Sequence, residues 1–159
     1  MKKLFTFLAC VMLNAAIAWA QNKEGDLIIG NWQPSDERSV IEIYKGRSDK
    51  GEDPNKYYGR IVWLKEPIDP ETGQPKVDKN NPDPAKRNTP LKGMVNLKDL
   101  EYVGDREWEN GTIYDPKNGT EYSFYATLPK GNDNIMEARG YIGVSLFGRT
   151  DTWKRLVKK

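Results

Sequence analysis

Residues 111–128 of the chain read GTIYDPKNGTEYSFYATL, and this stretch indicates the fold class. Two β-favouring runs flank the turn at residues 115–119, DPKNG. Proline fixes one φ angle and the Asn-Gly pair accepts positive φ, so the segment predicts a β-hairpin. A second turn at residues 131–134, GNDN, leads into the next β-favouring run. The region therefore predicts consecutive antiparallel strands.

Similar segments recur along the rest of the chain, and none after the first twenty residues has a sustained helical period. Further strands are expected at residues 40–44, 57–64, 94–97, 135–141 and 145–157. Roughly eight strands at this spacing predict an all-β barrel or sandwich. We favour a small closed or nearly closed antiparallel barrel, because neighbouring hairpins suffice to connect the strands and closure removes the sheet edges.

One long connection interrupts this pattern. Residues 65–92 hold six of the ten prolines, several Asp and Asn residues and few large apolar ones, so we expect a long loop that carries a function or covers the barrel. Asp78, Asn80, Asn81 and Asp83 offer oxygen atoms at close spacing. They lack the glycine and distant glutamate of a calcium-binding EF-hand loop, and Asx turns are the preferred interpretation.

The chain begins MKKLFTFLACVMLNAAIAWA, which combines two lysines, an apolar run and a small-residue cleavage motif. The apolar run is too short to span a membrane as a helix. Residues 1–20 are therefore predicted to be a signal peptide and residues 21–159 a single β-barrel domain. We expect an exported protein, periplasmic or extracellular, with no membrane span after cleavage.

Composition limits the chemistry of the mature chain. Lys2 and Lys3 are two of the 25 basic residues, so after cleavage 23 basic residues would face 23 acidic ones. A neutral chain without basic clusters does not favour nucleic-acid binding. The single cysteine, Cys10, lies in the leader and the chain has no histidine. We expect no cofactor and no metal site, because the usual nitrogen and sulfur ligands are missing.

Aromatic and arginine side chains on the predicted strands are the candidate ligand-binding residues. Strand alternation places Trp63 on the same face as Tyr57 and Ile61. Aromatic residues on strands more often form a packed core than a ligand cavity, so both interpretations stay open. The candidates are Trp63, Tyr114, Tyr122, Tyr141, Trp153, Arg139 and Arg149.

Several motifs in order resemble a known family. They are YYGRIVWLKEP at residues 57–67, DKNNPD at 78–83, PLKG at 90–93, GTIYDP at 111–116, GTEYS at 119–123 and GRTDTW at 148–153. Together they are similar to the bacterial domain of unknown function 2147 family over nearly all of the mature chain. The resemblance implies an exported, lipocalin-like barrel of the calycin type without an established substrate or catalytic residue.

The motif Gly30-Asn31-Trp32 is similar to the Gly-x-Trp that opens calycin barrels. The resemblance implies that Trp32 plugs one end of the barrel under an arginine of the last strand. Arg155 or Arg149 could provide that guanidinium, which would gain a cation–π contact. The role would be structural.

Three functions remain open. The leading hypothesis is a non-enzymatic binding module for a small apolar molecule or a cell-envelope component, which rests on analogy of fold. A carboxylate-based hydrolase of envelope glycans would need Asp115 to meet a second acid, with Glu121, Glu137 and Asp151 as candidates. The third alternative is an envelope assembly or interaction protein. No oligomeric state is predicted.

Overall fold

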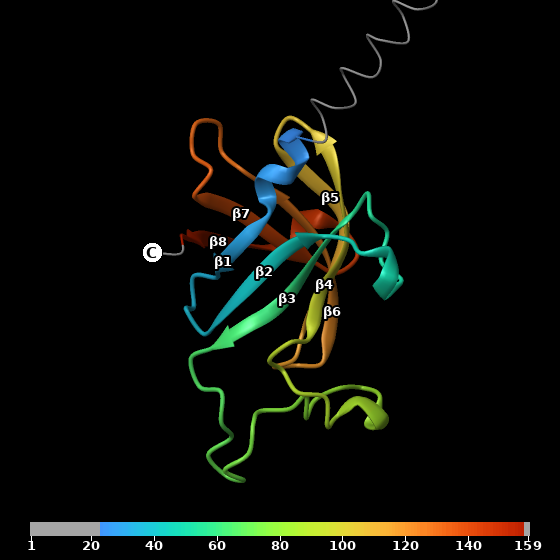
Figure 1. Ribbon diagram of the computed structural model, residues 1–159, viewed down its shortest axis with the longest axis vertical. Coiled ribbons are helices and arrows are strands. Elements are labelled where there is room, and N and C mark those ends of the chain that lie inside the picture. The colour runs from blue at the N-terminus through green and yellow to red at the C-terminus, as the bar shows by residue number, and fades with distance from the viewer. Residues whose placement is uncertain (1–22, 158–159) are drawn as a thin grey trace, which may run out of the picture.

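Eight strands form one closed antiparallel barrel in which each strand pairs with the next and the last pairs with the first (Figure 1). The computed structural model describes residues 23–157, and the predicted signal peptide lies outside the described residues. The strands are β1 (Gly30–Gln33), β2 (Ser39–Lys45), β3 (Tyr57–Leu64), β4 (Val95–Gly104), β5 (Glu107–Asp115), β6 (Thr120–Thr127), β7 (Ile135–Tyr141) and β8 (Arg149–Leu156). This architecture confirms the predicted all-β barrel.

Residues 23–25 are α-helical, and the other helical elements of the described chain are short 3₁₀ turns. They are η1 (Asp26–Ile28), η2 (Ser48–Lys50), η3 (Pro84–Lys86) and η4 (Ser145–Phe147). Within residues 23–157, no helix has the length and apolar character needed to cross a membrane.

The barrel is filled by side chains at the end that carries η1. Ile28 and Trp32 are completely buried there, together with Trp108. The indole N–H of Trp108 donates to the carbonyl of Gly25 at 3.1 Å, which ties the incoming chain to β5. The hydroxyl of Tyr57 donates to Asp26 at 2.8 Å. Apolar packing and these polar contacts close this end of the barrel.

A bulge in β3 changes which of its side chains face inward. Val40 pairs with Trp63, whereas the next residue, Ile41, pairs with Ile61, so β3 carries one extra residue here. An extra residue shifts the two-residue alternation of a strand. Ile61 is buried, but Trp63 is 44% exposed, unlike the expectation that placed both on one face.

Strands β4 and β5 extend well beyond the predicted segments 94–97 and 111–114. Their turn at Asp105 and Arg106 uses positive φ angles of 47° and 63° without a glycine at either position, so glycine-based turn rules do not find it. The last predicted strand, 145–157, starts later than expected, because η4 occupies its first residues.

Residues 65–94, which we call the strap, connect β3 to β4. In Figure 1 the strap lies beyond the end of the barrel opposite η1. Isolated bridges join Ile68 to Pro75 and Val77 to Pro90, so the strap folds back on itself. The strap therefore lies next to the end of the barrel that η1 does not close.

Candidate functional site

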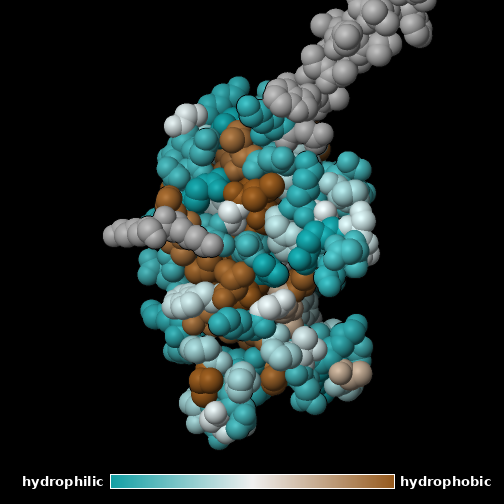
Figure 2. Space-filling model, in the orientation of Figure 1, coloured by the Kyte–Doolittle hydropathy of each residue, from teal (hydrophilic) through white to brown (hydrophobic). Residues whose placement is uncertain are grey.

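A cavity of about 760 Å³ opens toward the strap. This volume falls within the range of about 300–1,000 Å³ that is typical of small-molecule sites. Its inner wall is largely apolar, and five of the strands that line it contribute Ile41, Ile61, Ile113, Phe124 and Trp153. In Figure 2 hydrophobic residues gather in the middle of the molecule, while the strap below is mostly hydrophilic. The cavity therefore joins an apolar interior to a polar mouth.

Asn96 is the polar exception among the buried residues of this wall. Its side chain lies on β4, only 6% of the residue is exposed, and it lines the cavity. Its Oδ1 atom has no hydrogen-bond partner among the described residues. A buried acceptor without a partner costs about 1–3 kcal/mol, so this amide is an unusual residue in an otherwise apolar wall.

The strap is anchored to the barrel by a buried carboxylate. Asp78 is completely buried and accepts hydrogen bonds from the Tyr114 hydroxyl at 2.9 Å and from the Asn81 amide at 2.6 Å. Burial and the bond to Asp78 raise the pKa of Tyr114 to about 12. Tyr114 therefore remains a hydrogen-bond donor throughout the physiological pH range.

The strap also contacts the β5–β6 turn. The amide of Asn80 donates to the carbonyl of Lys117 at 2.9 Å. The turn residue Gly119 has a φ of 70°, and a Cβ atom there would lie 2.0 Å from the carbonyl oxygen of Asn80. Asn81 and Asp83 form the expected Asx turns, because their side-chain oxygens accept the backbone N–H groups two residues on. The polar residues of the strap thus act in its folding.

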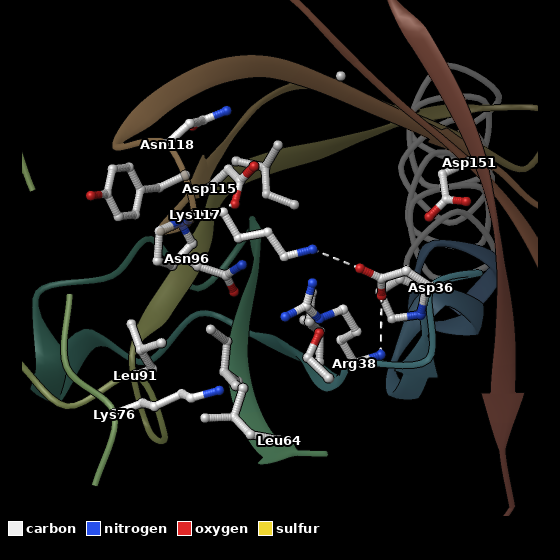
Figure 3. A pocket seen from close by; sticks show the side chains of 18 of the residues that line it. Asp36, Arg38, Leu64, Lys76, Leu91, Asn96, Asp115, Lys117, Asn118 and Asp151 are labelled. Carbon is white, nitrogen blue, oxygen red and sulfur yellow. Dashed lines mark hydrogen bonds and ion pairs between the residues drawn. The ribbon is translucent and has the colours of Figure 1, made fainter. Parts of the chain in front are cut away.

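An ion pair links the β1–β2 connection to the β5–β6 turn. The ammonium of Lys117 lies 2.7 Å from the carboxylate of Asp36, as the dashed line in Figure 3 shows. Burial tends to raise the pKa of Asp36, but hydrogen bonds from Lys117 and the backbone N–H of Arg38 outweigh it and hold this pKa below its ordinary value. Asp36 therefore stays ionised at neutral pH.

Four of the seven predicted ligand-binding residues line this cavity: Tyr114, Tyr122, Arg149 and Trp153. Trp63 does not line it, because the bulge turns it outward. Tyr141 also lies outside the lining and packs against Tyr125 with ring centres 6.2 Å apart. Arg139 instead holds η4, since its guanidinium donates to the carbonyl of Ser145 at 2.7 Å.

The predicted closing residues lie at the other end of the barrel. The guanidinium of Arg155 lies 4.2 Å from the centre of the Trp32 ring. Arg149, the alternative partner, lines the cavity mouth instead. Sequence reasoning missed Arg38, Asn96 and Lys117; an asparagine within a run of β-favouring residues was the available signal for Asn96.

Only two of the four acids considered as catalytic residues of a hydrolase line the cavity. Asp115 and Asp151 both line the mouth, whereas Glu121 and Glu137 are absent from the lining. Asp115 accepts the Lys117 backbone N–H at 2.9 Å, and Asp151 accepts the Trp153 indole N–H at 3.0 Å. Among residues 23–157 no group of three His, Cys, Asp or Glu side chains could hold a metal ion.

A family model described as "Uncharacterized protein conserved in bacteria (DUF2147)" matches residues 30–155. The chain belongs to this family. Its matched region runs from the first residue of β1 to Arg155 near the end of β8, so the whole barrel is the family's domain.

A solved structure shares the fold: "Protein HP1028 from the human pathogen Helicobacter pylori belongs to the lipocalin family". The two chains are 28% identical, with a TM-score of 0.64, over 82% of this chain and 83% of the other. No curated protein matched the chain. The lipocalin-like barrel of this DUF2147 chain suggests a ligand-binding module.

Proposed function

We propose that this protein is an exported, non-enzymatic binding module that holds a small, largely apolar molecule in its open barrel. The observation that carries this proposal is the cavity, whose inner wall is lined by Ile41, Ile61, Ile113, Phe124 and Trp153. Apolar side chains around an empty volume favour a ligand that buries apolar surface, at about 25 cal/mol per Å².

The two ends of the barrel differ, because one is filled by side chains and the other is open, and this difference supports the proposed binding site. Trp32 and Trp108 fill the end near η1, so a ligand enters from the strap end. Tyr114 and Asn80 hold the strap beside the mouth and leave the cavity open to it. Export rests on the leader at residues 1–20 and makes a molecule of the cell envelope a natural ligand.

The test is fluorescence titration of residues 21–159 with the neutral apolar dye N-phenyl-1-naphthylamine. Ile113 lines the cavity, so Ile113→Trp should fill part of it and weaken dye binding at least tenfold. Val103 is 50% exposed on β4 and outside the lining, so Val103→Trp is the matched control and should bind like the wild type.

Circular dichroism must show that both variants keep the β-sheet spectrum. Absence of dye binding to the wild-type protein, or equal affinity in the folded Ile113→Trp variant, would overturn the proposed binding function.

A further inference from the structure

Among the described residues at the cavity mouth, every carboxylate has a hydrogen-bond or ion-pair partner, but only some of the cationic side chains do. Of its cationic lining residues, half form ion pairs with acids of the same lining. These pairs are Lys117 with Asp36, Lys76 with Glu66 and Lys79 with Asp69. The other acids, Asp115 and Asp151, already accept the N–H bonds described above. The carboxylates of the mouth are therefore all engaged.

Three cationic side chains of the same lining remain. For Arg38, Lys65 and Arg149, no side-chain hydrogen bond or ion pair is found within residues 23–157. The backbone N–H of Lys65 donates to the carbonyl of Arg38 at 2.9 Å, so these two cationic residues occupy neighbouring backbone positions. The nearby Glu66 carboxylate already pairs with Lys76 at 3.0 Å, which lowers its pKa, and both cations lie near enough to lower that pKa further. An anion bound between Arg38 and Lys65 would add an attraction that Glu66 supplies only in part.

The unpartnered amide opens onto the same space. Asn96 lines the cavity together with Arg38, and Figure 3 shows the Arg38 guanidinium, the Lys117 ammonium and the Asn96 amide projecting into it. Both Arg38 and Lys117 lower the pKa of Asp36, which places the two cations near one carboxylate. Polar and cationic groups gathered at the mouth above an apolar wall match a ligand whose polar end is at the mouth.

We infer that the ligand is an anionic amphiphile, an acid with an apolar chain. The chain lies against the apolar wall, and the acid group lies at the mouth between Arg38 and Lys65. The side-chain N–H of Asn96 donates to the ligand's acid oxygens, or to a water molecule bound to them, and such a water molecule can donate to Oδ1. This inference rests on the proposed function, because it assigns the polar end of a ligand held in that cavity.

Competition against N-phenyl-1-naphthylamine tests the inference, with dodecanoate and dodecan-1-ol as matched probes below their aggregation concentrations. The alcohol is the more apolar probe, so hydrophobic burial alone favours it. We expect dodecanoate to bind about tenfold more tightly, since a hydrogen bond to a charged group contributes enough for that factor. Raising the salt concentration should reduce this preference, because the mouth is exposed.

Arg38→Gln should abolish the preference for dodecanoate and leave dodecan-1-ol affinity within about twofold. Lys92→Gln is the matched control: it removes one exposed positive charge from the strap outside the cavity lining, and the preference should persist. Asn96→Leu should weaken both polar probes but not the neutral dye.

The outcomes separate the two proposals. Dye binding without a preference for dodecanoate overturns the anionic ligand alone and leaves the apolar binding site standing. Failure of the dye and of both probes to bind overturns both proposals. A preference for dodecanoate that survives both Arg38→Gln and Lys65→Gln overturns the assignment of the acid group to these cations.

Discussion

Arg155 lies over the Trp32 ring, 4.2 Å from its centre, and joins the last strand of the barrel to the first. Its guanidinium also donates to three backbone carbonyls around the closed end. The acceptors are Leu27 at 2.5 Å, Ile29 at 2.6 Å and Asp133 at 2.7 Å. One side chain thus connects η1, the β6–β7 connection and the Trp32 plug.

Replacing this guanidinium should destabilise the protein without emptying the binding site. Arg155→Met removes the bonds to those carbonyls and the cation–π contact, and we expect a loss of about 2–4 kcal/mol in the free energy of unfolding. Urea denaturation measures it. The cavity lies beyond the plug, so the folded variant should still bind the apolar dye.

The control for this change is Lys154→Met, which removes a positive charge from an exposed neighbouring position on β8. Its free energy of unfolding should change by less than about 0.5 kcal/mol. An equal loss in both variants would contradict the specific role of Arg155.

Removing the Tyr114 hydroxyl should loosen the strap. Tyr114→Phe leaves the completely buried Asp78 with one side-chain donor fewer, at a cost of about 1–3 kcal/mol. Hydrogen exchange should become faster in residues 65–94, with the Asp78 N–H, bonded to the Thr89 carbonyl at 2.9 Å, as the reporter. Tyr125→Phe is the control, since no hydroxyl bond of Tyr125 is found in the described chain.

The Asp36–Lys117 pair should make a small contribution to stability that is lost in acid. The pKa of Asp36 is lowered in the folded state from an ordinary value of 3.8, so the contribution is fully present above about pH 4 and disappears as pH falls through the lower folded value. Both side chains are largely exposed, and solvent screening limits the effect to about 0.5 kcal/mol. Asp36→Asn should therefore be less stable than wild type at pH 7, and this difference should shrink as the pH falls below 3.8. A difference that stays constant as the pH is lowered would contradict the ion pair as its source.

The leader should be removed on export. Expression of the full chain in a bacterial host should yield an envelope fraction whose intact mass corresponds to a start at Gln21. Ala20→Asp should block cleavage and leave the precursor in the membrane fraction. Full-length protein recovered from the cytosol in both cases would rule out a signal peptide.

The main features of the fold could be predicted because they follow from local chemistry. The turn at residues 115–119 appears as expected: the Asp115 carboxylate accepts the Lys117 N–H at 2.9 Å, and Gly119 takes a φ of 70°. These preferences depend on a few neighbouring residues. The long strands β4 and β5 were underestimated, because their outer residues are charged and carry little β signal.

The cavity was only partly predictable. Tyr114, Tyr122, Arg149 and Trp153 were identified as strand residues that could face inward, and they line it. Trp63 was assigned by simple alternation, which fails after one extra residue in β3. The pairing of β2 with β3 creates that bulge, and nothing in the eight residues of β3 alone reveals it.

By itself the sequence determined the all-β class, the hairpin order and the family, since turn residues and alternating apolar positions act over short distances along the chain. Only the tertiary structure decided that the barrel is filled at the Trp32 end and hollow at the other. It also brought Asn96 of β4 and Arg38 of the β1–β2 connection to one cavity. Packing of side chains from strands far apart in the chain decides such features, and no local pattern encodes it.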